Sequence, residues 1–260
     1  MWSFSSAVVL LLLVVVTGAE AKPSRVVSLN LCADQLVLAL ADRDRIAALS
    51  PLAADPALSA AAGAARGLPA VRPVLEEVLP LRPDLAVAGA WGGQRVASML
   101  EARGVTVLRL GLAAGFDDIV AQARAVARAL GEVDRGEALA QSIGARLAAA
   151  QREERGARAL VWEARGFTSG EGTLTDAVLR AAGLRNAARF SGYGSIPLER
   201  LLSAPPDLLV VLFAANSPSL SEALLEHPAL AGLPRLSLPA AWFACGGPDT
   251  VRAVEALSAR

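Results

Sequence analysis

Residues 117–154 read DDIVAQARAVARALGEVDRGEALAQSIGARLAAAQREE, the longest uninterrupted helical pattern in this chain. Apolar side chains recur in it three and four positions apart, which places them on one face of an α-helix. The periodic positions are Ile119, Ala123, Val126, Ala127, Leu130, Leu139, Ile143 and Leu147. Because glycine weakens a helix, a kink or break is expected near Gly131–Gly136.

Strand-like and helix-like segments alternate on both sides of this stretch, a pattern typical of βα units with a parallel sheet. The expected strands are 25–30, 46–50, 84–89 and 105–110 before it, and 158–164, 207–213 and 235–241 after it. The expected helices are 34–41, 75–79 and 97–103 before it, and 174–182, 198–202, 221–226 and 249–258 after it. We therefore predict an α/β fold with two parallel-sheet lobes, residues 22–115 and 157–260, joined by a single long backbone helix within residues 116–156.

The two halves of the chain also resemble each other. Residues 76–87, EEVLPLRPDLAV, parallel residues 198–210, LERLLSAPPDLLV. Each stretch combines a short helix, a Pro-Asp turn and a buried strand. This weak internal repeat indicates two lobes that are built alike.

Residues 1–21 are predicted to be an export signal that is cleaved near Ala21. The unbroken apolar run at residues 7–16 is shorter than the about 20 residues that a membrane span needs. It is followed by TGAEA at 17–21, which ends in an A-x-A cleavage pattern. No Lys or Arg precedes the run, so an uncleaved membrane anchor is the alternative. No cysteine follows it directly, so a lipoprotein anchor is not expected, and we predict a soluble mature chain in the periplasm.

The charge composition excludes some function classes. Lys plus Arg and Asp plus Glu number 25 each, so nothing indicates a nucleic-acid partner. The lone histidine, His227, excludes a multi-histidine metal site.

Trp91, Trp162 and Trp242 each stand at or just past the carboxyl end of an expected strand. In open α/β sheets the ligand crevice lies at those ends, so flat side chains gathered there predict a pocket for a bulky, partly apolar ligand. The alternative is core packing, since Trp is buried on average. It applies most to Trp162, which alternates with Val161 along a strand.

Six motifs occur in a characteristic order and spacing. They are RVVSLN (25–30), EEVLPLRPDLAVA (76–88), GFTSGEGTLTD (166–176), AGLRN (182–186), GYGSIPLE (192–199) and HPAL (227–230). In this the chain resembles the helical-backbone class of ABC-transporter substrate-binding proteins, which serve iron–siderophore complexes, haem and cobalamin. The resemblance covers nearly the whole mature chain. It implies two lobes facing each other across a ligand cleft, a monomer, and delivery of a metal complex or corrinoid without chemistry on it.

The resemblance also implies one glutamate per lobe that docks on arginines of an ABC permease, which works with its ATPase. The matching positions are Glu76 and Glu199, with Glu77 as the neighbouring alternative. It implies no catalytic residue, cofactor or resident metal. A single stiff helix between the lobes leaves no flexible hinge, so ligand binding is expected to need little lobe motion.

The cysteines, Cys32 and Cys245, follow expected strands of different lobes, and in such a fold both point at the cleft. Three interpretations remain open: thiols that line the cavity, a disulfide as is usual in exported proteins, or joint coordination of a soft metal or haem iron. A disulfide across the cleft needs Cα atoms within about 7 Å and would lock the lobes against ligand entry. This favours lining thiols unless the cleft is narrow.

Tyr193 and Arg165 are further ligand-binding candidates. Tyr193 lies between two glycines, where its phenol either meets a ligand or belongs to a surface turn. Arg165 follows an expected strand and suits a carboxylate or phosphate on the ligand, or else pairs with Glu163 or Glu171.

Asn30 and Asp34 flank the first strand-to-helix turn. Asn30 is a candidate pocket residue. Asp34 is interpreted first as a residue of the helix N-terminus and only second as a pocket group.

The alternative function class is an exported α/β enzyme or a ligand sensor on the same fold. The sequence has no G-x-S-x-G, H-E-x-x-H or P-loop motif, and GEG at 170–172 lacks the third glycine of a dinucleotide-binding loop. His227 is a conceivable general base, but a surface residue at a helix end is the favoured interpretation.

Overall fold

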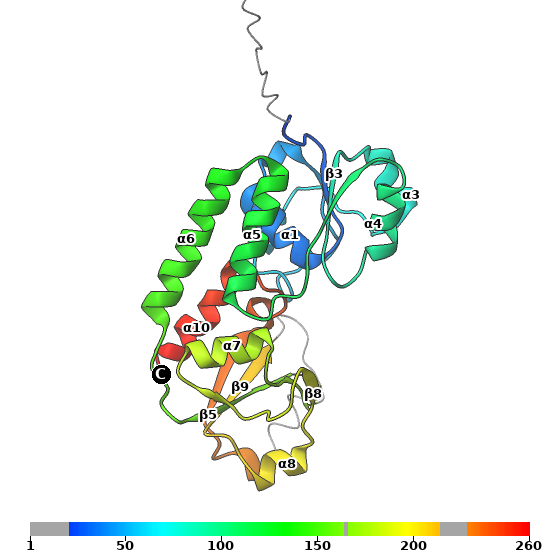
Figure 1. Ribbon diagram of the computed structural model, residues 1–260. Coiled ribbons are helices and arrows are strands. Elements are labelled where there is room, and N and C mark those ends of the chain that lie inside the picture. The colour runs from blue at the N-terminus through cyan, green and yellow to red at the C-terminus, as the bar shows by residue number, and fades with distance from the viewer. Residues whose placement is uncertain (1–20, 164–165, 214–227) are drawn as a thin grey trace, which may run out of the picture.

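Two parallel sheets, one in each half of the chain, form the framework of the protein (Figure 1). This computed structural model describes residues 21–163, 166–213 and 228–260. The predicted export signal before Ala21 and the predicted helix 221–226 lie outside the described residues. Within those three ranges, no helix combines the length and apolar character that crossing a membrane requires.

The sheet of the first lobe has the strand order β2-β1-β3-β4, and all its pairs are parallel. The strands lie close to the expected segments, and the helices follow them as βα units. The elements are β1 (Val26–Ser28), α1 (Leu31–Leu40), β2 (Ile46–Ala48), α2 (Ala62–Ala65), α3 (Leu75–Val78), β3 (Leu85–Ala88), α4 (Gln94–Glu101) and β4 (Thr106–Arg109).

The sheet of the second lobe has the order β10-β9-β5-β7 and is also parallel. Its elements are β5 (Arg158–Trp162), α7 (Leu174–Ala181), β7 (Arg185–Asn186), α8 (Leu198–Ser203), β9 (Leu208–Phe213), β10 (Arg235–Pro239) and α10 (Val251–Ser258). An unexpected antiparallel pair, β6 (Phe167–Ser169) and β8 (Tyr193–Ser195), follows β5. Read from the opposite edge, the two parallel sheets share one topology, since β1 and β3 correspond to β5 and β9.

The Pro-Asp turns of the internal repeat perform the same task in both lobes. The Asp84 carboxylate accepts hydrogen bonds from the backbone N–H groups of Ser24 and Arg25 at 2.7 and 3.0 Å, just before β1. The Asp207 carboxylate likewise accepts from the backbone N–H of Arg158 at 2.7 Å, at the start of β5. Each aspartate therefore fixes the register between its own strand and the neighbouring one.

The central helical stretch forms two helices, α5 (Phe116–Leu130) and α6 (Val133–Ala150), instead of one continuous helix. The break predicted in this stretch is confirmed. Gly131 has φ 70°, a left-handed conformation that glycine adopts without strain. The Glu132 amide then donates to the Ala127 carbonyl at 2.8 Å, which closes the end of α5.

Helices α5 and α6 lie side by side as a helical hairpin along one side of the molecule (Figure 1). A Cβ atom on Gly136 would lie 2.3 Å from the Ala127 Cβ, so glycine permits this close approach. The chain enters the second lobe through α6, where Arg146 pairs with both carboxylate oxygens of Glu255 at 2.8 and 2.9 Å. The α/β class with two parallel-sheet lobes is confirmed, and α6 is the backbone helix that joins them.

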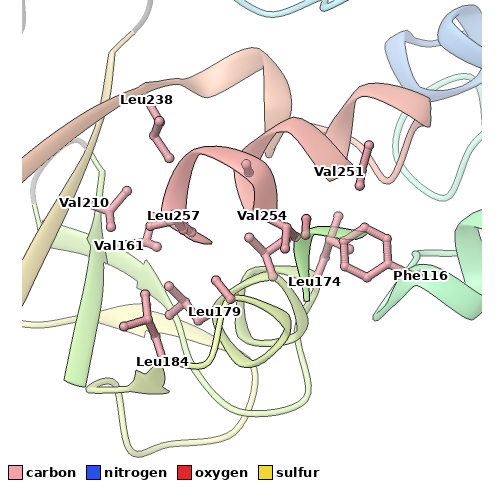
Figure 2. Packing of buried hydrophobic residues seen from close by; sticks show 14 of the residues in the cluster. Phe116, Val161, Leu174, Leu179, Leu184, Val210, Leu238, Val251, Val254 and Leu257 are labelled. Carbon is pink, nitrogen blue, oxygen red and sulfur yellow. The ribbon is translucent and has the colours of Figure 1, made fainter. Parts of the chain in front are cut away.

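The apolar face of the hairpin contributes to the cores of both lobes. Val126 and Leu130 pack in a cluster of the first lobe. Phe116 and Ile143 pack in the second lobe, among side chains of β5, β9, α7 and α10 (Figure 2). Fully burying such a side chain contributes roughly 1.5–3 kcal/mol, so the hairpin anchors each lobe by hydrophobic packing.

Asp34 lies in the first turn of α1, as expected, and its carboxyl group is fully buried. It accepts hydrogen bonds from the Ser50 amide at 3.0 Å and from the Ser50 hydroxyl, which ties α1 to the chain after β2. Burial raises the pKa of Asp34 from 3.8 to about 6, although hydrogen bonds from Ser28 and Ser50 oppose the shift. Compared with the unfolded chain, the fold therefore favours the protonated form of this carboxyl.

We predict that Asp34 makes stability fall as pH rises. Because its pKa is about 6 in the folded state and 3.8 ordinarily, its contribution is fully present below pH 3.8 and is lost as pH passes 6. The difference of about two between these pKa values corresponds to roughly 3 kcal/mol in the free energy of unfolding. Denaturant unfolding should show wild type losing about that much between pH 4 and 7 relative to Asp34→Asn. Parallel pH profiles for the two proteins would contradict this.

Candidate ligand-binding site

A cavity of about 590 Å³ lies between the two lobes. Its wall is formed where strands of both parallel sheets end, as the crevice rule for α/β sheets predicts. From the first lobe, Cys32 follows β1, Trp91 follows β3 and Leu112 follows β4. From the second lobe, Glu163 follows β5 and Phe243 follows β10.

Aromatic rings line this cavity from both lobes. Trp91 is 69 % exposed, far more than a tryptophan that serves the core. From the second lobe, Phe167 on β6 and Tyr193 on β8 form a stacked pair with ring centroids 6.3 Å apart and planes at 7°. Trp91 and Tyr193 are ligand-binding candidates predicted from the sequence, whereas Phe167 and Phe243 are not. A prediction of the β6–β8 pair would have identified Phe167, but the sequence pattern does not predict this pair.

Trp162 and Trp242 do not line the cavity, so their assignment as ligand contacts is not supported. Trp162 is 2 % exposed and packs with Leu160 on one face of the sheet, because alternate side chains of β5 point to opposite faces. Trp242 packs against the core of the second lobe. In each case the next residue, Glu163 or Phe243, lines the cavity instead.

Asn30 lies behind the wall of the cavity and holds part of that wall in place. Its Oδ1 accepts from the backbone N–H groups of Ala33 and Gly89, both at 3.1 Å, and thereby caps α1. Its Nδ2 donates to the backbone carbonyl of Trp91 at 2.7 Å. A Cβ on Gly89 would overlap the Asn30 amide, so glycine is required there. Asn30 thus holds the segment that carries the exposed indole.

Cys32 and Cys245 form a disulfide that joins the two lobes, with Cα atoms 5.2 Å apart and a sequence separation of 213. This overturns the favoured interpretation as free lining thiols and also the alternative of joint metal coordination. Both residues still line the cavity. The expectation that such a bond would lock the lobes against ligand entry is wrong, because the bond lies in the wall of the cavity and the cavity extends beside it.

Two glycines permit the close approach of the second lobe to the first that this bond requires. A Cβ on Gly246 would lie 2.4 Å from the Ala113 Cβ, and one on Gly247 would lie 2.8 Å from Gln35 Oε1. No larger residue fits without displacing these neighbours. The sequence Cys245-Gly246-Gly247 therefore permits a backbone approach that strand positions alone do not reveal.

The described cavity wall carries little charge. Glu163 is its one carboxyl group, and no Lys, Arg or His belongs to the described lining. Burial raises the pKa of Glu163. Arg165 and His227 lie outside the described residues. Among the positions that the structure describes, no group of three or more His, Cys, Asp or Glu side chains is placed to hold a metal ion.

The predicted docking glutamates are both exposed on short helices, Glu76 on α3 and Glu199 on α8. Neither carboxylate has a partner within the described part of the chain. The alternative, Glu77, accepts from both the amide and the side chain of Arg72, at 2.8 and 2.6 Å, and these bonds lower its pKa. The geometry therefore favours Glu76 over Glu77.

Comparison with known proteins decides the family. Residues 26–235 match the model of a family described as periplasmic binding protein. The chain belongs to this family. A cobalamin-binding protein of Halobacterium salinarum is 28 % identical over an alignment of 219 residues that covers 80 % of this chain and 59 % of that relative. The chain thus spans less than two thirds of the length of this curated relative.

Solved structures of periplasmic binding proteins have the same fold. The periplasmic haem-binding protein of Roseiflexus sp. RS-1 in its apo form is 26 % identical, with a TM-score of 0.76 and coverage of 91 % of this chain and 97 % of that one. A periplasmic haem-binding protein of Pseudomonas aeruginosa is 27 % identical, with a TM-score of 0.74 and coverage of 91 % and 92 %. The vitamin B12-binding protein of Vibrio cholerae, at 21 % identity and a TM-score of 0.71 with coverage of 92 % and 96 %, shares the fold. These members are binding proteins rather than enzymes.

We predict that the inter-lobe disulfide is a main contributor to stability. Closing a loop of 213 residues contributes up to about 5 kcal/mol in the chain-entropy account. Cys32→Ser with Cys245→Ser should lower the free energy of unfolding by about 3–5 kcal/mol, and reductant should lower wild type to the same level without affecting the variant. Thiol titration of unfolded, unreduced wild type should find no reactive thiol. Two reactive thiols would contradict the assignment.

Proposed function

We propose that this chain is the substrate-binding component of an ABC importer. It acts in the periplasm as a monomer, captures a metal chelate or corrinoid (an iron–siderophore complex, haem or cobalamin) and delivers it unchanged to a membrane permease. Residues 22–115 and 157–260 form the two lobes of this carrier, and residues 116–156 connect them. The observation that carries the proposal is the aromatic-lined cavity of about 590 Å³ between the lobes of a periplasmic binding protein.

The size and surface of the cavity support a bulky, flat ligand. Its volume lies within the range of about 300–1,000 Å³ that is usual for small-molecule sites. Trp91, Phe167 and Tyr193 are 69 %, 40 % and 56 % exposed, so large ring faces are available to a ligand. Aromatic contacts are worth about 0.5–1.5 kcal/mol each beyond the area that they bury. A planar macrocycle or catecholate between these rings would cover them.

The docking role of Glu76 and Glu199 is supported by their exposure and by carboxylates that have no partner among the described residues. Charged groups at the rim of an interface mainly set the association rate and orientation of a partner. One such group on each lobe would orient the carrier so that its cleft faces the permease. The proposed partner surface carries arginines, which bind carboxylates in a bidentate manner.

Ligand binding is tested with the purified oxidised protein, using cyanocobalamin, haemin and a panel of ferric siderophores in equilibrium titrations. We expect tight binding of one of these classes and a loss of about tenfold or more in Trp91→Ala, because the exposed indole is covered on binding. Trp242→Phe is the matched control, since Trp242 packs in the core, and should leave affinity unchanged. Binding of none of these ligands, or equal affinities for wild type and Trp91→Ala, would contradict the proposal.

Docking is tested by Glu76→Ala combined with Glu199→Ala. We expect ligand affinity to stay at the wild-type value while ligand uptake by cells that express the cognate permease is lost, because neither carboxylate lines the cavity. Glu77→Ala, which removes a carboxylate already held by Arg72, serves as the control and should leave uptake intact. A parallel loss of affinity and uptake in the double variant would show that the docking role is wrong.

A further inference from the structure

Glu163 is a half-buried carboxyl group in the wall of the cavity. It directly follows β5, at the edge of the second sheet that faces the ligand site. Other glutamates, such as Glu77, Glu101 and Glu137, are held by arginines that lower their pKa. Glu163 instead has no side-chain partner within the described residues, and its pKa is raised by burial. An unpartnered carboxyl in such a place is costly unless a ligand satisfies it.

Hydrogen bonds hold the backbone of Glu163 in a defined position. The Glu163 amide donates to the Phe167 carbonyl at 2.9 Å, and its own carbonyl accepts from the Gly166 amide at 3.2 Å. The Thr168 hydroxyl donates to the Val161 carbonyl at 2.6 Å, which binds β6 to β5. The backbone of Glu163 is therefore tied to β6, which carries Phe167 of the stacked pair, and Glu163, Phe167 and Tyr193 all line the cavity.

Glu163 dominates the electrostatic potential of the cavity wall, because the described residues around it carry no charge. The other described lining residues are mostly apolar, and the polar ones, such as Gln122, Ser169 and Thr175, are neutral. A carboxylate on a ligand would meet a like charge in a poorly solvated place, or would force Glu163 to take up a proton. A ligand N–H group would instead donate a hydrogen bond to it, and hydrogen bonds to charged groups are among the stronger ones.

We propose that Glu163 determines the ligand preference of the cavity: it selects complexes whose periphery carries carboxamide N–H groups, and it disfavours those that carry carboxylates. The inference rests on the proposed function, because it presupposes a ligand in this cavity. Within the ligand classes proposed above, it favours corrinoids, with their carboxamide side chains, over haem with its propionates. Glu163 is then a specificity-determining residue that contacts the ligand directly.

The test measures equilibrium affinities of the oxidised full chain for dicyanocobinamide, which carries carboxamides and no carboxylate, and for haemin. Wild type should prefer dicyanocobinamide. Glu163→Gln, which keeps the shape and removes the charge, should reduce the ratio of the two affinities by roughly tenfold to a hundredfold. Glu163→Asp, which keeps the charge, should retain the wild-type preference. Glu171→Gln removes an exposed charge outside the cavity wall and is the matched control.

The possible outcomes distinguish a failure of the role of Glu163 from a failure of the proposed function. An unchanged ratio in Glu163→Gln, an equal change in Glu171→Gln, or a wild-type preference for haemin would overturn the role of Glu163 and leave the proposed function standing. Binding of neither probe, nor of any siderophore, by wild type would overturn the proposed function and this inference with it. Thermal unfolding of each variant checks the fold. If Glu163→Gln does not fold, Glu163→Ser carries the same expectation.

Discussion

The disulfide between Cys32 and Cys245 is the constraint on which the geometry of the site depends. Two separated attachments between the lobes are α6, with its Arg146–Glu255 ion pair, and this covalent bond in the cavity wall. Two separated attachments restrict rotation of one lobe against the other far more than a single helix does. The cavity is therefore preformed, and a ligand need not bear the full cost of ordering the two lobes when it binds.

The aromatic rings that line the cavity are carried by segments that the fold holds in place. The Asn30 amide donates to the backbone carbonyl of Trp91, and Phe167 and Tyr193 lie on the paired strands β6 and β8. Rigid aromatic side chains lose little conformational freedom when a ligand covers them, so more of the contact energy appears as affinity. Glu163 adds an electrostatic preference to a wall whose described remainder is neutral.

Much of the fold could be predicted from the sequence, because strand position and helical periodicity are local properties. The Pro-Asp repeat indicated the two like-built lobes, and the glycines after Leu130 indicated the break between α5 and α6. The direction of a side chain is harder to predict from the sequence. Trp162 and Glu163 are adjacent, and only their position on the twisted sheet decides which one reaches the cavity. The disulfide was weighed but not favoured, because the close approach permitted by Gly246 and Gly247 is a tertiary property.

The central claim, a fixed separation of the lobes, is tested most directly by pulsed dipolar spectroscopy. Spin labels are attached through non-cysteine residues introduced at Glu76 and Glu199, one on each lobe, so that the native disulfide stays intact. The oxidised, ligand-free protein should give one narrow distance distribution, which broadens after reduction of the disulfide. A broad or bimodal distribution in the oxidised protein would contradict a preformed cavity.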